Sequence, residues 1–589
     1  MRLRYVILLS LALRLIAWTV VCRMDVPPIW DEVWYLSRGV AYGRIVTGYV
    51  SGPPASNAVY ARAYGEGAWP PLHPVLLGLA FAVFGPSLAI ARLVVVLQST
   101  VTTAVVYFLT ARLANRRAAL AAAALHAVYP SFVAYSHYVL SETTYILTWL
   151  TALYFILQTV REEHPAAWMS SAVLAGIFLG LAGLTRATAL PLLSIVPLWC
   201  LVARQPIVRR LAAICTLYAV SAVVVAPWLV TLHAREHRFV PLATNAGLNL
   251  YMGNHPGGWS PLKWIQHPRI EGAIAEYATA HGLNQDDAAR AMAWAYIRDD
   301  PRGAVRRALG RLRAVWLPDQ VIVRNLLNVA YPPLPLPVAA LVWAGIVCSF
   351  LVFVACVLAG LFGPTVDWRH RIFLVTCVVL AATPYLLTNM TSRRALPLWA
   401  TVLPLAGAGI ASVVVRRRSR AAAGWLAFAM LGYWGLYRSA PQMALGLTGT
   451  AASYYSPLLR HTPYAEALVK DRLFLRYTGE VPGQSVHLQL LSEPYQFDPS
   501  PNRDDPDPRS FTWKAQPRSM LATDLWADHI EATPPAVAVR VFPSGAATIL
   551  RPVESNAWRH WQPTQIDGID YAWTGADAPF DEEMKRRLQ

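Results

Sequence analysis

The chain has 589 residues, of which 55% are hydrophobic and only 14% charged, and its apolar residues gather in blocks instead of alternating with polar ones. This composition excludes an array of soluble domains and predicts a polytopic helical membrane protein. The formal net charge of +17 comes from basic residues in short runs between the apolar blocks. Such runs are typical of topology signals and lipid head-group contacts, so we expect no nucleic acid partner.

The first apolar segment, residues 5–22, follows Arg2 and Arg4. It lacks a small-residue cleavage site, so we expect it to be retained as a signal anchor. The six cysteines all fall in or at the ends of apolar segments. Their positions suggest neither a disulfide framework nor a zinc site.

Apolar blocks of roughly 17 to 25 residues, enough for a helix to cross ~30 Å of hydrocarbon, recur along the chain. They predict about eleven spans, near residues 4–22, 88–111, 118–134, 143–160, 168–184, 188–203, 211–231, 336–361, 372–388, 396–415 and 421–438. A shorter block, residues 70–84, begins with Trp69-Pro70-Pro71 and ends at Gly85-Pro86. We expect it to form an interfacial or re-entrant helix.

The basic clusters beside these spans fall on one side of the membrane when residues 70–84 are left out of the count. These clusters are Arg112/Arg116/Arg117, Arg204/Arg209/Arg210, Arg369/Arg371 and Arg416/Arg417/Arg418/Arg420. By the positive-inside rule, this side and the N-terminus are cytoplasmic. We therefore expect an integral protein of the cytoplasmic membrane, with loops 23–87 and 232–335 and the tail outside the cytoplasm.

From about residue 441 the chain turns to Pro, Asp and Arg, with short alternating runs such as Ser485-Val-His-Leu-Gln-Leu490 and residues 536–542. Alternation predicts strands, so we expect residues 1–440 to form the membrane domain and 441–589 a small extracytoplasmic mixed α/β or β domain. Within the second long loop, residues 302–316 carry apolar side chains on one helical face and arginines on the other. This pattern predicts a helix on the membrane surface.

Two adjacent carboxylates, Asp31 and Glu32, follow the first predicted span. A carboxylate at a bilayer edge is costly unless it meets a cation, a proton or a reacting hydroxyl, so this loop is a candidate active site. The alternative is a solvated loop charge. Glu142, at the outer start of the predicted fourth span, is a second acidic candidate, unless it is only a helix-start carboxylate with Ser141 as the cap.

Three arginines lie on the same predicted side as these acids. Arg186 interrupts an apolar run at the outer edge of the membrane, and Arg393 and Arg394 lie in a short outward loop against the charge bias. A guanidinium binds phosphate through its planar fork, so the three cations indicate an anion site. The alternative is that they extend to lipid head groups.

The remaining polar candidates are weaker. His73 lies among apolar residues, where a lone histidine more often packs than binds a ligand. Residues 245–256 are rich in Asn and Gly, and this composition predicts turns. The side-chain amides of such turns, including those of Asn249 and Asn254, could bind sugar hydroxyls. The alternative is a purely structural loop. No His/Cys/Asp cluster has zinc spacing, so we expect no required cofactor and no metal, with a divalent metal ion at Glu142 as the alternative.

Several motifs, in their order and spacing over residues 1–415, resemble the GT-C membrane glycosyltransferases of the family 39 type, which include protein O-mannosyltransferases and the lipid A aminoarabinose transferase. The motifs are Trp30-Asp31-Glu32-Val-Trp-Tyr35-Leu36, Trp69-Pro70-Pro71-Leu72-His73-Pro74, Tyr138-Val-Leu-Ser141-Glu142, Gly183-Leu-Thr-Arg186, Asn245-Ala-Gly-Leu-Asn249-Leu-Tyr-Met-Gly253-Asn254-His-Pro256 and Arg393-Arg394-Ala-Leu396-Pro397-Leu. The tail from residue 440 onward does not match.

The resemblance implies the all-α GT-C fold and transfer of a hexosyl or pentosyl group from a polyprenyl-phosphate carrier, generally with inversion. The implied partners are this donor, membrane lipid, and a protein, lipid or glycan acceptor. Asp31 would be the base that takes the acceptor's proton, and Glu32 would orient the acceptor or raise the basicity of Asp31. Glu142 and the arginines would hold the sugar and the phosphate.

Two other functions remain open at this point. A non-enzymatic flippase or transporter of lipid-linked sugars would share the lipid groove and the arginines, but it would not need Asp31 as a base. A scaffold would instead bind partners through residues 441–589.

Overall fold

The structure is a computed structural model, and it describes residues 2–23, 31–51, 69–161, 164–201, 205–255, 267–312, 317–319, 322, 336–388, 392–416, 419–439, 538–541, 547–550, 562–566 and 569–573. Most of these residues are helical, and seven helices are long and apolar enough to cross a membrane. The predicted fold class, a polytopic helical membrane protein, is confirmed.

The seven helices each coincide with a predicted span. They are α1 (Leu3–Arg23), α5 (Leu88–Leu113), α9 (Pro165–Gly183), α11 (Ile207–Glu236), α17 (Leu336–Phe362), α18 (Trp368–Leu387) and α19 (Ser392–Arg416). The other four predicted spans contain shorter, broken or less apolar helices. These are α6 (Arg116–Val128) with α7 (Pro130–Ala134), α8 (Ser141–Arg161), the 3-10 helix η1 (Ala187–Ser194) with α10 (Ile195–Leu201), and α20 (Ser419–Ser439). The count of about eleven spans therefore stays a prediction.

The break between α6 and α7 has a covalent cause. Pro130 has no N–H, so the carbonyl of His126 loses its helical partner. Arg14 of α1 is buried and takes over this carbonyl, at 3.1 Å, together with that of Ala127, at 3.2 Å. A cation is also favoured at the negative end of the helix dipole. The broken helix end is thus stabilised by a side chain from the first span.

The first long loop contains two helices that pack together, α2 (Asp31–Ser51) and α4 (Leu72–Phe84). Contact is close at Gly78, where an added Cβ would lie 2.6 Å from the Cβ of Tyr42. Helix α4 has 13 residues and a length of ~20 Å, too short for a span of ~30 Å. It is followed by Gly85, whose backbone φ of 81° is readily adopted by glycine but is sterically unfavourable for a residue with a Cβ atom.

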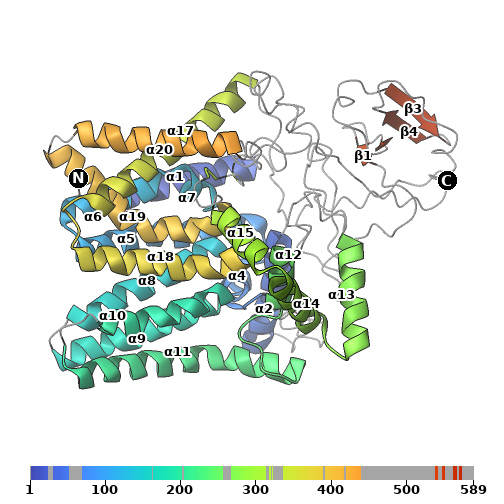
Figure 1. Ribbon diagram of the computed structural model, residues 1–589, viewed down its shortest axis with the longest axis horizontal. Coiled ribbons are helices and arrows are strands. Elements are labelled where there is room, and N and C mark those ends of the chain that lie inside the picture. Colours follow the sequence, from blue (N-terminus) through green and yellow to red (C-terminus); the bar gives the residue numbers. More distant parts are fainter. Residues whose placement is uncertain are drawn as a thin grey trace.

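The second long loop forms four helices, α12 (Ala246–Asn254), α13 (His267–His281), α14 (Gln285–Asp299) and α15 (Pro301–Arg311). Figure 1 shows them together at one end of the helical bundle. The turns predicted for the Asn- and Gly-rich segment are wrong, because most of it is helix α12. Tertiary contacts override the local composition here.

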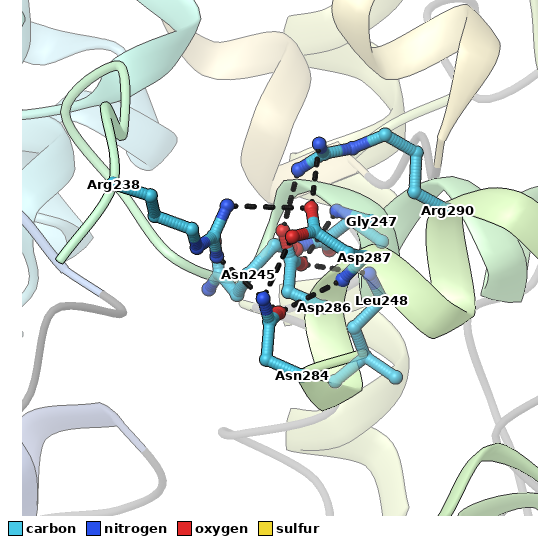
Figure 2. A network of polar contacts seen from close by, with 9 residues as sticks. Arg238, Asn245, Gly247, Leu248, Asn284, Asp286, Asp287 and Arg290 are labelled. Carbon is cyan, nitrogen blue, oxygen red and sulfur yellow. Dashed lines mark hydrogen bonds and ion pairs between the residues drawn. The ribbon is translucent and has the colours of Figure 1, made fainter. Parts of the chain in front are cut away.

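Helix α12 is held at its N-terminus by α14. The buried carboxylate of Asp286 accepts hydrogen bonds from the amides of Gly247, at 2.6 Å, and Leu248, at 3.2 Å, and it also pairs with Arg290 at 2.7 Å. Figure 2 shows these contacts with the neighbouring Asp287, which pairs with Arg290 as well. These two amides belong to the set that a helix leaves unpaired at its start, so Asp286 acts as a cap supplied by another helix.

The end of α18 is held by the same loop. Asn254 donates its side-chain N–H to the carbonyl of Leu387, at 2.9 Å, and Arg311 donates to the carbonyl of Leu386. These carbonyls are among the groups that a helix leaves unpaired at its C-terminus. Helices α12 and α15 therefore anchor on α18 shortly before Arg393.

Helix α15 (Pro301–Arg311) confirms the helix predicted over residues 302–316 as far as Arg311, and residues 313–316 lie outside the described residues. Val305 and Leu309 are exposed on one face, beside the exposed arginines Arg302 and Arg306. Its placement on a membrane surface stays a prediction.

The described part of the tail consists of four strands, β1 (Ala538–Val541), β2 (Ala547–Leu550), β3 (Gln562–Ile566) and β4 (Ile569–Trp573). They form two antiparallel pairs, β1 with β2 and β3 with β4. Strand β1 falls in the predicted alternating run 536–542, whereas the run 485–490 lies outside the described residues. A separate domain at 441–589 stays a prediction.

Candidate active site

Four charged side chains from distant parts of the sequence form one chain of ion pairs. Arg393 contacts both acids, with Nη1 at 2.8 Å from Oδ2 of Asp31 and Nε at 2.5 Å from Oε1 of Glu142. Arg186 completes the series, with Nη1 at 2.7 Å from the same Glu142 oxygen. The sequence Asp31–Arg393–Glu142–Arg186 thus joins α2, α19, α8 and the turn between α9 and η1.

The helix ends favour three of these four charges at their positions. Asp31 and Glu142 lie in the first turns of α2 and α8, where the helix dipole favours a negative charge. Arg186 follows the end of α9, and its backbone N–H bonds to the carbonyl of Ala182. A cation is favoured at that negative helix end. Arg393 is the exception, because it lies in the first turn of α19, where the dipole disfavours a cation, and its two ion pairs with Asp31 and Glu142 offset this.

Burial separates the two acids. The side chain of Glu142 is fully buried, with 0% exposed, whereas that of Asp31 is 33% exposed. A buried carboxylate between two guanidiniums is stable only while both partners remain. Burial by itself lowers the pKa of Arg186, but the neighbouring Glu142 outweighs this effect and holds the pKa well above its ordinary value. Glu142 is thus a fixed anchor, and Asp31 is the acid within reach of solvent.

Two hydroxyl groups that the sequence analysis did not assign to the site also belong to it. Tyr35 donates its O–H to the hydroxyl of Ser141 at 3.0 Å, and Arg186 donates to the same oxygen at 3.2 Å. Burial and the nearby Asp31 raise the pKa of Tyr35 to about 12, so it remains a proton donor near neutral pH. The spacing of four residues from Asp31 to Tyr35 was the available signal, because such pairs share a helix face.

Glu32 has a different partner from its neighbour. Its Oε1 accepts a hydrogen bond from the backbone N–H of Val139 at 2.5 Å, and the residue is buried. This contact ties the start of α2 to the segment that leads into α8. The predicted part of Glu32 in catalysis stays a prediction.

The arginine pair is divided between two environments. Arg393 faces the acids, while the guanidinium of Arg394 lies 5.9 Å from the ring centroid of Tyr385. The Tyr385 hydroxyl in turn contacts that of Thr188 at 3.0 Å. Arg394 is therefore a third arginine of the site, next to the ion-pair chain that contains Arg186 and Arg393.

His73 packs behind Tyr35. Its ring meets that of Tyr35 edge to face at 4.9 Å, and its Nδ1 lies 2.8 Å from the hydroxyl of Thr144. Burial lowers the pKa of His73 to about 4, so the ring is neutral near pH 7. These contacts link α2, α4 and α8, and a direct contact of His73 with substrate stays a prediction.

The two predicted amide contacts use their N–H groups within the protein. Asn249 donates to the carbonyl of Asn245 at 2.7 Å, in its own helix, and Asn254 donates to Leu387. Both side chains therefore stabilise α12 or its contact with α18. Their predicted contact with a sugar stays a prediction. Among the described residues, no group of three or more His, Cys, Asp and Glu side chains could hold a metal ion.

Residues 68–230 match the protein-family profile of the dolichyl-phosphate-mannose-protein mannosyltransferases. The resemblance to the GT-C glycosyltransferases is confirmed. The matched region contains Glu142 and Arg186, while Asp31 and Arg393 lie outside it. Comparison with curated proteins gives no match to this chain.

Three solved structures are similar to the chain. The Archaeoglobus fulgidus oligosaccharyltransferase in complex with Zn and sulfate is 17% identical, with a TM-score of 0.43, over 79% of this chain and 56% of that one. ArnT from Cupriavidus metallidurans bound to undecaprenyl phosphate is 18% identical, with a TM-score of 0.34, over 69% and 78% of the two chains. The Saccharomyces cerevisiae protein O-mannosyltransferase Pmt1-Pmt2 complex bound to the sugar donor is 17% identical, with a TM-score of 0.29, over 39% and 33%. The chain spans little more than half the length of the archaeal enzyme.

Proposed function

We propose that this protein is a membrane glycosyltransferase that moves a sugar from a polyprenyl-phosphate carrier to an acceptor hydroxyl. The observation that carries the proposal is the ion-pair chain Asp31–Arg393–Glu142–Arg186. It places a partly exposed carboxylate 2.8 Å from a guanidinium. A direct displacement at an anomeric carbon needs both groups, a base for the acceptor and a cation for the leaving phosphate.

The transfer is a single displacement. The acceptor oxygen attacks the anomeric carbon while its proton passes to the carboxylate of Asp31. The bond between the anomeric carbon and the phosphate oxygen breaks, and its electron pair stays on that oxygen. The products are the glycosylated acceptor, with inverted configuration, and polyprenyl phosphate. Arg393 and Arg394 stabilise the charge that grows on the leaving oxygen, which is the transition-state interaction that accelerates the reaction.

Glu142 has a separate role in this proposal. Because it is fully buried and already shared by two arginines, it is unsuited to receive a proton from an acceptor. It instead holds Arg186 and Arg393 at the spacing that the phosphate requires. Fixed charges of this kind need no reorganisation as the reaction proceeds.

The membrane placement follows the charge bias of the sequence. We place the N-terminus in the cytoplasm and the site, loops 23–87 and 232–335 and residues 441–589 on the outer face. The donor is then a lipid-linked sugar of the outer leaflet, and the acceptor is a protein, lipid or glycan. The proposed reaction uses no metal ion, because the guanidinium of Arg393 already bridges the two acids. The alternative is that a divalent cation binds at Glu142.

The test is transfer of label from a radioactive polyprenyl-phosphate sugar by the purified full-length protein, with a membrane extract as acceptor source. Asp31→Asn should lower the rate by roughly 10²- to 10⁴-fold, the usual worth of a general base. Asp299→Asn, the same change at an exposed position of α14, should leave the rate unchanged. Full transfer by Asp31→Asn removes the base assignment. Absence of transfer by the wild type, with translocation of the labelled lipid across liposomes, supports the flippase instead.

A further inference from the structure

Arg393 has more than one potential partner in the proposed reaction. We infer that Asp31 and the phosphate of the donor compete for Arg393, so that binding of the donor releases Asp31 to act as the base. This inference rests on the proposed function and adds to it an order of events. The donor must bind before the base becomes available.

The geometry of the guanidinium decides which acid can leave. Nε and Nη2 of Arg393 both point to Glu142, with distances of 2.5 Å to Oε1 and 3.3 Å to Oε2. Only Nη1 faces Asp31, at 2.8 Å. Glu142 is therefore held by two hydrogen bonds from Arg393 and a third from Arg186, whereas Asp31 is held by a single ion pair.

Burial also favours replacement of Asp31, and not of Glu142, by the donor phosphate at Arg393. Moving Arg393 away from Glu142 would leave a charge inside the protein without one of its partners, which is strongly unfavourable. Asp31 can leave at lower cost because a third of its side chain is exposed, and water can replace the lost contact. The Nη1 position is thus the one that an incoming anion can take.

A phosphate can take that position in place of a carboxylate. In the sugar-linked donor it is a diester with one negative charge, and its free oxygens match the arginine fork. Two acids and two arginines sum to zero in the ion-pair chain, and Arg394 adds a positive charge next to it. The released Asp31 then lies beside a bound anion, and a neighbouring like charge makes a carboxylate a better proton acceptor. Donor binding therefore both frees the base and strengthens it.

The inference predicts an increase in affinity when the base is removed. If the Asp31–Arg393 pair is formed about nine-tenths of the time, the free site is about one-tenth populated, and binding is weakened about tenfold. Asp31→Asn should then bind undecaprenyl phosphate about tenfold more tightly than the wild type. Titration of the purified full-length protein in nanodiscs, followed by intrinsic tryptophan fluorescence, measures this. Undecaprenol, which has no phosphate, should bind equally to both proteins.

A double-mutant cycle separates competition from simple charge repulsion. In an Arg393→Gln background the contested cation is gone, so Asp31→Asn should tighten binding of undecaprenyl phosphate much less than it does in the wild type, by the part that comes from like-charge repulsion. A tightening that persists in full in that background would show repulsion alone and would overturn the inference. Unchanged or weaker binding by Asp31→Asn, in a protein that elutes and melts like the wild type, would overturn it as well.

The outcome is distinct from that of the transfer experiment. If the wild type transfers sugar and Asp31→Asn does not bind the phosphate lipid more tightly, the competition is absent while the proposed function stands. If no transfer occurs but the affinity change and the cycle behave as expected, Arg393 is shared between Asp31 and a lipid phosphate in a protein that is not a transferase. The inference then loses its catalytic meaning and fails with the proposed function.

Discussion

Glu142 determines the position of both arginines in the site, since its carboxylate accepts from Arg186 at 2.7 Å and from Arg393 at 2.5 Å. Ser141 bonds to Tyr35 and Arg186, so the motif Ser141-Glu142 contributes two adjacent residues to one polar cluster. The two carboxylates of the site thus differ in burial, because Glu142 is fully buried and Asp31 is partly exposed.

Replacing Glu142 tests whether its buried carboxylate anchors the two arginines. Glu142→Gln keeps the shape of the side chain but leaves two guanidiniums close together without their shared anion. We expect a loss of about 3 to 5 kcal/mol in the free energy of unfolding, the range for breaking a buried ion pair. Thermal unfolding of the purified protein measures it, with Asp299→Asn as the exposed control. A melting temperature equal to that of the control would contradict the anchoring role.

Helices of the second long loop hold the end of α18 that lies next to the site. Helix α12 is capped by Asp286 at its start and reaches α18 through Asn254 at its end. Gly247 lies so close to the backbone of Asp286 that an added Cβ would overlap the carbonyl oxygen of that residue. The glycine is therefore required by packing between α12 and α14, and the motif that suggested sugar-binding turns is in large part a packing motif.

Alanine substitutions in two helices test this packing interpretation. Ala is favoured over Gly by about 1 kcal/mol in a helix interior, so Gly310→Ala in the last turn of α15, where an added Cβ meets nothing within 4 Å, should stabilise the protein by less than this amount. Gly247→Ala should do the opposite, because the overlap with Asp286 outweighs the helical preference. Hydrogen exchange of residues 246–254 measures the effect on α12. Slower exchange in Gly247→Ala would contradict the packing argument.

Across the chain, long apolar blocks and isolated charges in the sequence were enough to predict the membrane spans and the charged residues of the site. Seven of the predicted spans are long apolar helices, and Asp31, Glu142, Arg186 and Arg393 come together as the motifs suggested. The partners of these charges could not be predicted, because they depend on packing between segments far apart in the sequence. Glu32 shows this best, since adjacency to Asp31 suggested a shared role and the structure gives it the amide of Val139.

The break between α6 and α7 could not be predicted either, because it depends on a contact with a distant segment. Residues 118–134 contain no Asp, Glu, Lys or Arg. Pro130, which follows α6, is tolerated because Arg14 of α1 donates hydrogen bonds to the carbonyls of His126 and Ala127 at the end of α6. Nothing in a window of seventeen or so residues shows that such a partner exists. A proline inside an apolar block was the only local warning.

Contacts between α1 and α5 relate the ends of the bundle to the sides of the membrane. Ser10 meets Thr103 at 2.7 Å, and Trp18 bonds to the carbonyl of Ala89 at 3.0 Å, so the two helices run antiparallel. The start of α1 and the end of α5 therefore lie at one end of the bundle. Arg14 and His126 each lie about 15 Å along a helix that begins at this end, which places their contact near the middle of a ~30 Å bilayer.

This arrangement predicts which residues reach water on each side. We expect Asn115, next to the basic cluster after α5, to face the cytoplasm and Asp299, at the end of α14, to face outward. In a background without the six native cysteines, Asp299→Cys in intact cells should react with a membrane-impermeant maleimide, whereas Asn115→Cys should react only after the cells are lysed. The positive charges near Asn115 are retained in both variants, so neither change alters the signal that sets the orientation. Labelling of Asn115→Cys in intact cells, with Asp299→Cys protected, would invert the topology and place the site in the cytoplasm, where an acceptor outside the cell could not reach Asp31.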